Sequence, residues 1–348
     1  MHHDERTLHF VQLRFLGSTV RGMTYYAPLI SMLATLALAF FLTMGKIGCI
    51  AHDIPNERSL HDKPVPRTGG IALISGVLAG WMTLQFWQWW VVLPLLGLFV
   101  LSLVDDVKNL SPGKRLVGHF FAAFVALSGA GVSTAWFVPV LLFIVWMTNL
   151  YNFMDGADGL AGGMALFGFG CYGAGALIGG HEAFALLNFS IAAAALGFLF
   201  FNFHPARIFM GDAGSIPFGF LAAVLGVWGW QIGLWPFWFP VLVFSPFVAD
   251  ATITLLKRAQ RGEKLSHAHR CHYYQRLVQM GWGHRNTALA EYALMSLVGL
   301  SALWGIGMSH LMQGCLLLFW SVVYLLQMAW IDRGWQQYQL VEKKVSDV

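Results

Sequence analysis

Four polar side chains recur at intervals of three in one stretch of the sequence: Asn149, Asn152, Asp155 and Asp158. In a helix or a tight helical turn, this spacing brings successive members onto neighbouring positions of one face. Two amides and two carboxylates then form an oxygen-rich surface at the point where a long apolar segment ends. Carboxylates at a membrane boundary are energetically costly and typically bind a cation or a substrate. The stretch therefore predicts a functional surface at the end of a membrane helix.

Three more carboxylates follow or precede apolar segments: the adjacent pair Asp105 and Asp106, and Asp212 in a glycine-rich turn. With Asp155 and Asp158 they could hold a hard divalent cation such as Mg²⁺, which takes carboxylates, waters and substrate phosphates as ligands. Adjacent aspartates also repel each other, which favours a cation or a proton between them. A solvated helix end is the alternative for the Asp105-Asp106 pair alone. Five carboxylates on one face weaken that alternative.

The turn that carries Asp212 reads Phe209-Met-Gly-Asp-Ala-Gly-Ser215. Glycines let the backbone approach a ligand closely, and their exposed N–H groups can bind a phosphate. For the turn on its own, the alternative is a helix start capped by Asp212 or Ser215. The turn thus predicts either a phosphate-binding loop or an ordinary helix N-terminus.

The composition places these motifs in a membrane protein. The chain has 348 residues, of which 57% are hydrophobic and only 11% are charged, whereas a soluble domain carries roughly 25% charged residues. A hydrocarbon core about 30 Å thick needs roughly 20 apolar residues per helix, and unpaired backbone groups exclude open strands. We therefore predict an all-α polytopic bundle of about eleven transmembrane helices, at 25–44, 69–87, 89–104, 117–132, 134–150, 161–179, 184–202, 214–232, 236–256, 288–308 and 311–331.

The same pattern divides the chain into three parts. Residues 1–22 are polar and are expected to be a disordered or dispensable tail, residues 23–331 form the integral membrane catalytic domain, and residues 332–348 form a cytoplasmic tail. The four cysteines are scattered and form no CxxC pair, which favours reduced thiols over a disulfide framework or a metal site.

Basic residues give the orientation. Eighteen of the 21 Lys and Arg residues lie in the regions 45–68, 105–116, 203–213, 257–287 and 332–348. With eleven spans, all five regions fall on one side of the membrane, and the positive-inside rule makes that side the cytoplasm. The N-terminus is then outside, and its three arginines conflict mildly with the rule. Every acidic motif named above falls on the same, cytoplasmic side.

Individual basic residues of these loops could bind phosphate groups of substrates, although orienting the chain in the membrane is the alternative role for each. The candidates are Lys63, Arg67, Lys114, Arg115 and Arg270. Three histidines, His267, His269 and His272, lack the Cys or Glu partners of a zinc site, which favours contacts with phosphate or sugar. Together these features indicate transfer of a phosphoryl-linked group to a lipid, a reaction catalysed by positioning and by neutralising charge.

A cation- or proton-coupled transporter is the competing hypothesis, because acids inside membranes often mark ion paths. A transporter should place acids near the midplane and on both faces of the bundle. Here the acidic motifs gather at one face, and only Asp250 lies deeper. This distribution favours an enzyme.

Four motifs in the same order give the chain a resemblance to a known family. The chain resembles the polyprenyl-phosphate N-acetylhexosamine-1-phosphate transferases, which are relatives of phospho-N-acetylmuramoyl-pentapeptide transferase. The resemblance extends from about residue 52 to 277, and the motifs are Arg58-Ser-x-His61 with Pro64-x-Pro66-Arg-Thr-Gly69-Gly70, Asp105-Asp106, Asn152-x-x-Asp155-Gly-x-Asp158-Gly, and Asn202-x-x-Pro205-Ala-x-x-Phe-Met-Gly211-Asp212-x-Gly-Ser215.

The resemblance implies a reaction and its reactants. A sugar 1-phosphate moves from a UDP-N-acetylhexosamine to undecaprenyl phosphate, which gives UMP and a lipid-linked pyrophosphate sugar. The implied cofactor is Mg²⁺, with Mn²⁺ as an alternative, and Asp212 would ligate it. Asp105 and Asp106 would orient or deprotonate the lipid phosphate, and Asp105 would assist with the metal. The implied location is the bacterial inner membrane, with the active site facing the cytoplasm.

The remaining roles also follow from the resemblance. Asn152, Asp155 and Asp158 would hold the nucleotide end and metal-bound waters, and Asn202 would be a supporting polar contact. Further substrate-binding residues would be Lys63, Arg67, Arg270 and His272. No nucleic-acid partner is expected, and the oligomeric state, a homodimer included, stays open.

One stretch departs from the family pattern. Many members carry Asp-Arg-x-His-x-His-His before an Arg-Leu pair, whereas this chain has Tyr274 and Gln275 in place of the two later histidines. Arg270 and His272 match the pattern, and His267 and His269 are additions. The variation resembles the subgroup that starts O-antigen or similar surface glycans more than the peptidoglycan enzyme, and it leaves the identity of the sugar open.

Overall fold

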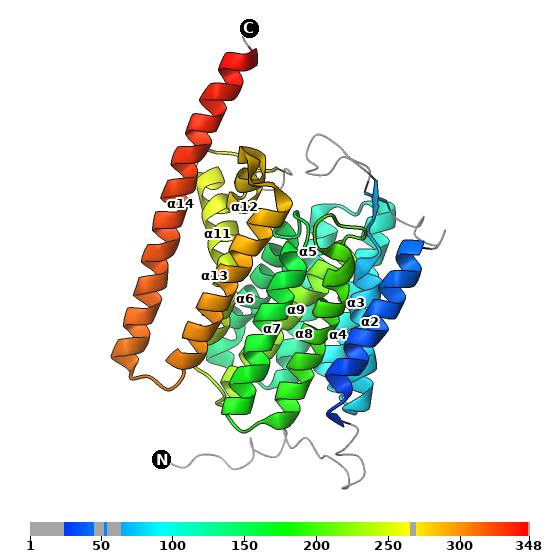
Figure 1. Cartoon of the computed structure of the whole chain (residues 1–348). Coiled ribbons are helices and arrows are strands. Elements are labelled where there is room, and N and C mark those ends of the chain that lie inside the picture. Colours follow the sequence, from blue (N-terminus) through cyan, green and yellow to red (C-terminus); the bar gives the residue numbers. More distant parts are fainter. Residues whose placement is uncertain (1–23, 45–51, 54–63, 265–268, 347–348) are drawn as a thin grey trace.

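The computed structural model of the chain describes residues 24–44, 52–53, 64–264 and 269–346. The predicted tail at 1–22 and the candidates Lys63 and His267 lie outside these residues. The described part is a bundle of long helices that run up and down beside one another (Figure 1). The elements in chain order are α2 (Ala27–Met44), β1 (His52–Asp53), β2 (Val65–Pro66), α3 (Gly69–Thr83), α4 (Trp89–Lys108), α5 (Pro112–Ala130), α6 (Thr134–Phe153), α7 (Leu160–Ile178), α8 (Glu182–Asn202), α9 (Asp212–Gln231), α10 (Trp238–Val243), α11 (Ser245–Gln260), α12 (Tyr273–Leu277), the π-helical turn η3 (Val278–Trp282), α13 (Gly283–Gly305) and α14 (His310–Ser346).

The predicted all-α membrane fold is confirmed. Each of the eleven predicted segments coincides with a helix or, at 236–256, with the consecutive helices α10 and α11. In the described residues, eight helices are long and apolar enough to cross a membrane: α2, α4, α6, α7, α8, α9, α14 and the continuous run from α12 to α13. The apolar helix α3 is shorter, with 15 residues. The chain is thus a multi-pass membrane protein.

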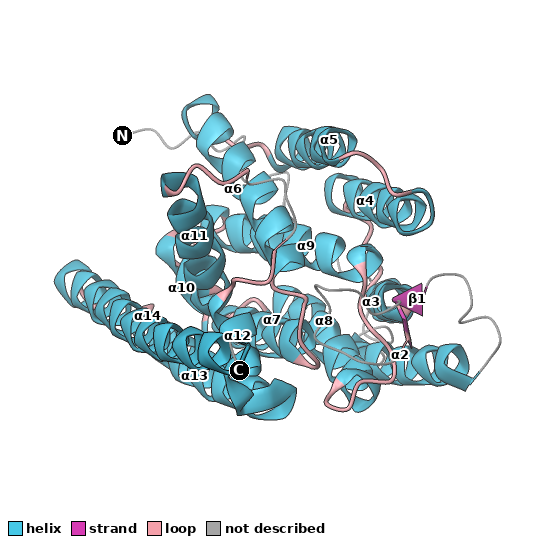
Figure 2. Cartoon of the chain, turned by 90° about the horizontal axis from the view of Figure 1, so that it is seen from above, coloured by secondary structure: helices cyan, strands magenta, loops and turns pink. Residues whose placement is uncertain are grey.

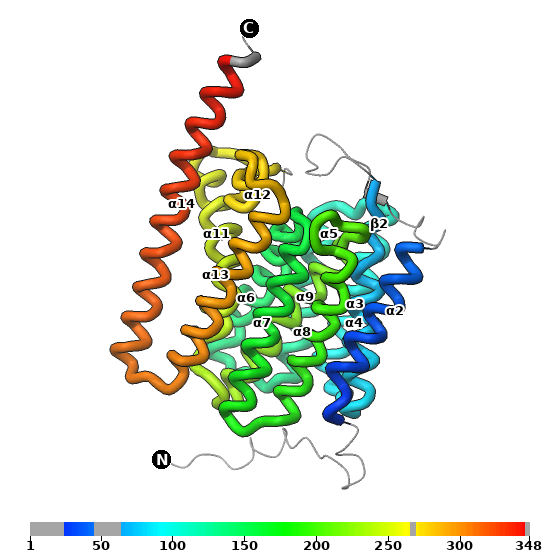
Figure 3. The backbone as a smooth tube through the Cα atoms, viewed as in Figure 1, coloured from blue at the N-terminus to red at the C-terminus, as the bar shows by residue number. Residues whose placement is uncertain are grey.

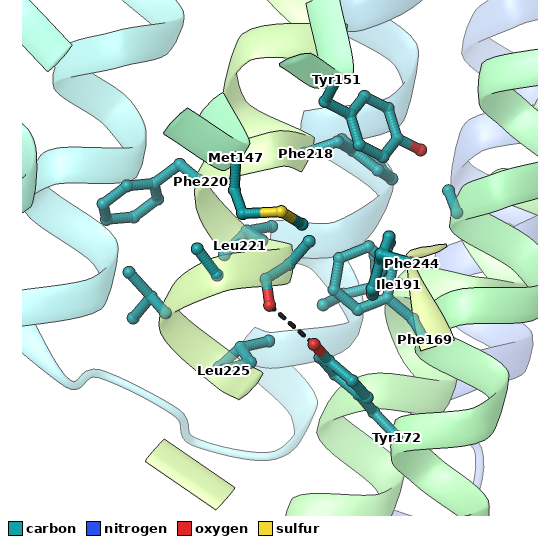
Figure 4. Close-up of a cluster of buried hydrophobic side chains, with 14 of the residues drawn as sticks. Met147, Tyr151, Phe169, Tyr172, Ile191, Phe218, Phe220, Leu221, Leu225 and Phe244 are labelled. Atoms are coloured by element: carbon teal, nitrogen blue, oxygen red, sulfur yellow. Dashed lines mark hydrogen bonds between the residues drawn. The ribbon is translucent and has the colours of Figure 1, made fainter. Parts of the chain in front are cut away.

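Helix α9 is the centre of the bundle. Seen from above, it is surrounded by α3, α4, α6, α7 and α8 (Figure 2), and 94% of its apolar window is buried. Side chains of neighbouring helices pack on it, among them Met147 and Phe169, and the Tyr172 hydroxyl donates a 2.9 Å hydrogen bond to the Ala222 carbonyl oxygen (Figure 4). Because small residues let helix backbones approach closely in lipid, the glycines and alanines of α7, α8 and α9 suit this packing. Helix α9 is therefore enclosed by neighbouring helices along its length.

The predicted polar motifs that fall within the described residues meet at one end of the bundle, which we call the site end. It contains the C-termini of α4, α6, α8 and α11 and the N-termini of α3, α5, α7, α9 and α13, together with α12 and the pair β1–β2 (Figure 1). Every Lys and Arg among the described residues belongs to this end. The opposite end has one described acid, Glu182, which accepts a 2.6 Å hydrogen bond from the Tyr25 hydroxyl.

Several boundaries differ from the predicted ones. The predicted span at 236–256 is two helices, because the chain breaks at Phe244 and restarts with Pro246 in the first turn of α11. Residues 332–346 of the predicted tail are not a separate segment but continue α14 as one helix to Ser346, so that α14 extends beyond the other helices (Figure 3). A short antiparallel pair, in which His52 is opposite Pro66 and Asp53 is opposite Val65, was not predicted.

Candidate active site

Two distant motifs dock on each other through their backbones. The amides of Gly69 and Gly70 donate hydrogen bonds of 2.9 and 2.8 Å to the carbonyl oxygens of Phe209 and Met210, and the Phe209 amide donates one of 2.8 Å to Pro66. The approach is so close that a Cβ atom on Gly70 would lie 2.4 Å from the Gly214 nitrogen. This contact explains the glycine pair at 69–70. It sets the N-termini of α3 and α9 side by side.

Three carboxylates lie close together beside this contact, and we call Asp105, Asp106 and Asp212 the carboxylate cluster. The Nη1 atom of Arg115 lies 3.1 Å from Asp105 Oδ2 and 3.3 Å from Asp212 Oδ2, so one guanidinium joins the end of α4 to the start of α9. The Asp106 carboxylate accepts a hydrogen bond from the Ala213 backbone N–H. The predicted convergence of Asp105, Asp106 and Asp212 is thus present in the structure.

The side chains in and around the carboxylate cluster differ in their exposure to solvent. The side chain of Asp105 is 8% exposed, and it also accepts a 2.6 Å hydrogen bond from the Leu110 N–H. The side chains of Asp212 and Arg115 are 24% and 32% exposed. Arg67 acts electrostatically on both Asp106 and Asp212. Asp212 and Arg115 are therefore more accessible than Asp105 to a ligand from the aqueous side.

Asn152 belongs to the same neighbourhood. Its Oδ1 accepts a 2.7 Å hydrogen bond from the hydroxyl of Ser215, which is in the first turn of α9 beside Asp212. Asn149, one turn earlier, instead donates to the Val145 carbonyl oxygen of its own helix at 2.7 Å. Helix α6 ends at Phe153, so Asp155 and Asp158 are in the turn that follows. The four side chains therefore do not share one helical face.

Asp158 has a separate set of partners. Its Oδ2 lies 2.7 Å from His204 Nδ1 and accepts a 3.1 Å hydrogen bond from the Ala206 N–H, and its Oδ1 lies 3.5 Å from His284 Nδ1. The two imidazole rings are parallel, with centroids 5.6 Å apart. Asp158 thus ties the turn after α8 to the start of α13. The predicted group of five carboxylates is therefore divided into the carboxylate cluster, the histidine-linked Asp158, and Asp155, which lies half-buried in the turn after α6.

Asn202 binds two backbone segments and is 3% exposed. Its Oδ1 accepts a 3.1 Å hydrogen bond from the Gly159 N–H, and its Nδ2 donates a 2.9 Å hydrogen bond to the Ile208 carbonyl oxygen. The amide therefore joins the turn that carries Asp158 to the turn that carries Asp212. Its role as a substrate contact stays a prediction.

Replacing Asn202 by leucine is expected to lower the free energy of unfolding by about 2–4 kcal/mol, because it leaves a buried N–H and a buried carbonyl without their partner. The measurement is thermal unfolding in detergent. Asn188→Leu on the same helix is the matched control, because the Asn188 amide donates to Phe184 of its own helix. Equal loss of stability in the two variants would contradict the role given to Asn202.

The deeper acid, Asp250, organises the loop that departs from the family pattern. It accepts hydrogen bonds of 3.0 Å from the backbone N–H groups of Tyr273 and Tyr274, and its Oδ1 lies 3.1 Å from His272 Nδ1. Carboxylates stabilise helix N-termini in this way. His272 is buried at 2% exposure and its ring stacks near Phe153 at 6.4 Å. His272 therefore packs against Phe153 of the 149–158 stretch and supports that stretch.

His269 and Arg270, which precede His272 in the chain, are less buried than His272. The His269 ring is 4.9 Å from the His272 ring, and burial together with His272 and Arg258 lowers the pKa of His269 to about 4. At neutral pH His269 is therefore uncharged and could contact a ligand only as a hydrogen-bonding group. Arg270 is exposed and lines a cavity beside α14.

Three residues important to the geometry were not singled out from the sequence for these contacts: Arg115 as the bridge between two aspartates, and His204 and His284 on Asp158. Arg115 was a general phosphate-binding candidate, but its spacing from Asp212 carries no signal of contact. His204 stands between Asn202 and Pro205 of a recognised motif, so its position was a usable signal. His284 comes from a distant helix, and only the fold brings it to Asp158.

The donor set of the carboxylate cluster suits Mg²⁺. Among the described residues, no group of three or more His, Cys, Asp or Glu side chains forms a ready metal cage. Mg²⁺ does not require one, because it usually takes one or two carboxylates together with waters and substrate phosphates. Asp212 is more exposed than Asp105, and the two carboxylates share the Arg115 guanidinium. These two residues would hold the ion, which would neutralise phosphate charge.

Comparison with known proteins identifies the family. The family model described as glycosyl transferase family 4 matches residues 88–229. A probable undecaprenyl-phosphate N-acetylglucosaminyl 1-phosphate transferase of Bacillus subtilis is 31% identical over 299 residues, which cover 80% of this chain and 83% of the relative. The chain belongs to glycosyl transferase family 4.

Two other relatives are similar to this chain over different shares of its length. A decaprenyl-phosphate N-acetylglucosaminephosphotransferase of Mycobacterium tuberculosis is 28% identical over 84% of this chain and 82% of its own length. A phospho-N-acetylmuramoyl-pentapeptide-transferase of Chlorobium phaeobacteroides is 30% identical over 57% of this chain and 68% of its own length. This family member is accordingly a bacterial membrane transferase of the class that moves a phospho-sugar to a polyprenyl phosphate.

Proposed function

We propose that the chain transfers N-acetylhexosamine 1-phosphate from a UDP-sugar to undecaprenyl phosphate, with Mg²⁺, at the cytoplasmic face of the bacterial inner membrane. The carboxylate cluster is the observation that carries the proposal, because it combines acids and guanidinium groups at the mouth of a membrane bundle. The names of two of the relatives make N-acetylglucosamine the first sugar to test. The product would start O-antigen or another surface glycan.

In this reaction an oxygen of the lipid phosphate attacks the phosphorus that bears the sugar. A new P–O–P bond forms, the bond from that phosphorus to the oxygen bridging to the nucleotide phosphate breaks, and UMP leaves with that oxygen. Asp105 or Asp106 would orient the lipid phosphate and accept its proton when it arrives as the monoanion. The guanidinium groups of Arg67 and Arg115 would bind phosphate oxygens as charge moves toward the leaving UMP. A bound Mg²⁺ would add further neutralisation of the diphosphate.

Positioning of the nucleotide end would fall to the neighbouring turn. Asn152 is held by Ser215 at the start of α9, and Asp155 is half-buried next to it. Asp158 and Asn202 would act indirectly: they would not contact the nucleotide but would hold in place the turns that carry these groups. The cytoplasmic placement of the site rests on the positive-inside rule, since every described Lys and Arg is at the site end.

The transporter hypothesis has less support from the geometry. Asp250 makes its hydrogen bonds with the loop that follows α11, and Glu182 at the opposite end is bound by Tyr25. Glu291 on α13 is half-buried inside a span, and most of the described acids lie at the site end. A transport cycle needs coupling sites that both sides can reach.

The testing experiment is a UMP-release assay with purified chain, undecaprenyl phosphate, Mg²⁺ and a panel of UDP-N-acetylhexosamines. We expect UMP release with UDP-N-acetylglucosamine and a rate at least tenfold lower with its epimer UDP-N-acetylgalactosamine. Excess chelator should reduce release to background, and added Mg²⁺ or Mn²⁺ should restore it. Full activity in chelator would refute the metal proposal, and no UMP from any donor would refute the proposed reaction.

A further inference from the structure

A cavity is present at the site end, away from the carboxylate cluster. It has a volume of about 740 Å³ and lies between the loop that follows α11 and the part of α14 that extends beyond the bundle. Its walls include Arg261, Arg270 and Arg276 from the loop side and Trp335, Gln336 and Gln339 from α14. The volume is in the range of ligand-binding pockets. No residue of the carboxylate cluster lines it.

The electrostatic balance of the cavity favours an anion. Two acids, Asp332 and Glu342, also line it. Asp332 is already paired, because it lies 2.5 Å from Lys257 Nζ and 2.7 Å from Arg276 Nη1. Arg270 and Arg261 carry their charge at exposed positions, Arg261 with a distant 3.8 Å contact to Glu263. The three arginines that line the cavity outnumber its two acids.

The Arg276 side chain is held in place in the wall of this cavity. It is 5% exposed, and its guanidinium lies over the rings of Tyr273 and Trp335, with centroids 4.9 and 5.9 Å away. In the described part of the chain its buried Nε atom has no hydrogen-bond partner. A buried guanidinium N–H without an acceptor is costly. An anionic oxygen in the cavity would supply that acceptor.

The depth of the cavity matches the headgroup layer of a bilayer. The exposed Trp282 and Trp330 contact each other with ring centroids 5.8 Å apart, and tryptophan is enriched at the membrane interface. Asp332 is the first charged residue of α14 beyond this pair. The cavity extends along α14 from Asp332 to Glu342, about 15 Å at the rise of an α-helix, and it therefore begins in the headgroup layer.

We propose that this cavity binds the phosphate-bearing headgroup of an anionic membrane lipid. Arg276 would donate its Nε–H to a phosphate oxygen, Arg270 and Arg261 would complete the positive wall, and the ring of Trp335 would cover the glycerol region. Basic pockets at this depth are suited to anionic headgroups. The site is distinct from the one that would hold the polyprenyl phosphate acceptor.

The experiment uses the full chain, purified in a neutral detergent and titrated with phosphatidylglycerol under native mass spectrometry. The test variant combines Gln336→Glu and Gln339→Glu, which place two negative charges on the cavity wall. Gln337→Glu is the matched control, because Gln337 lies between them on the same helix but does not line the cavity. Arg270→Gln is a second test variant that removes a positive charge. Thermal unfolding verifies that all variants fold.

We expect the wild-type chain to bind phosphatidylglycerol at least tenfold more tightly than phosphatidylcholine. The double variant and Arg270→Gln should each lose on the order of tenfold in affinity, and Gln337→Glu should keep the wild-type value. Wild-type affinity in both test variants would overturn the proposal. Displacement of the lipid by millimolar glycerol phosphate would overturn the assignment to a lipid, because it would make the cavity a site for soluble phosphates.

Discussion

Replacing Asp212 by asparagine is expected to lower the rate of UMP release by about a thousandfold or more, with little change in stability. The side chain is similar in size, but it loses the charge that pairs with Arg115 at 3.3 Å and that would bind the metal ion. Arg115 keeps its 3.1 Å contact with Asp105, so the end of α4 should stay in place. The measurement is the initial rate at saturating donor and Mg²⁺.

The matched control for this variant is Glu182→Gln at the opposite end of the bundle, where the same change of charge should leave the rate within about twofold of wild type. Thermal unfolding of both variants separates a loss of chemistry from a loss of fold. Near-wild-type turnover by Asp212→Asn would remove Asp212 from the metal site and leave Asp105 and Asp106 as the candidates.

Replacing Gly70 by alanine is expected to have the second-largest effect, through geometry. The added Cβ would lie 2.4 Å from the Gly214 nitrogen and 2.5 Å from the Ala213 carbonyl carbon, and neither backbone atom can rotate away. The starts of α3 and α9 must separate, which overpacking data put at about 1–3 kcal/mol of stability. A displacement of about 1 Å at Asp212 would lower the rate by roughly a hundredfold.

Gly97→Ala on α4 is the control for this experiment, because a Cβ at Gly97 would meet nothing within 4 Å. We expect Gly97→Ala to unfold at or slightly above the wild-type temperature, since alanine favours a helix interior. Unfolding temperature and initial rate are measured for both variants. If Gly70→Ala matched Gly97→Ala in both, the backbone docking of the two motifs would not be what positions Asp212.

Hydropathy was sufficient to predict the helices, because a helix that spans the membrane must be apolar over its whole length, whether its side chains face lipid or other helices. It could not predict the break at Phe244 or the continuation of α14 to Ser346, since apolar content says where a helix can enter lipid but not where the helix ends. Pro246 was a visible signal for the break, because proline lacks the N–H that a continuous helix needs there.

The candidate site was predictable in part. The convergence of Asp105, Asp106 and Asp212 at one end follows from the predicted spans between them, because an even number of spans returns the chain to the same end of the bundle. The pairing of side chains does not follow from it. The interval of three from Asn149 to Asp158 suggested one shared face, but α6 ends at Phe153 and Asp158 turns to His204 and His284. Such partners come from distant helices and depend on packing.

The fate of the sugar-linked phosphate tests the central claim most directly. Purified chain is supplied with undecaprenyl phosphate, Mg²⁺ and UDP-N-acetylglucosamine that carries a radiolabel in the phosphate attached to the sugar. We predict that the label enters the lipid fraction and that UMP appears in equal molar amount. Release of labelled UDP instead would mean transfer of the sugar alone. That result would contradict the proposed phospho-sugar transfer at the carboxylate cluster.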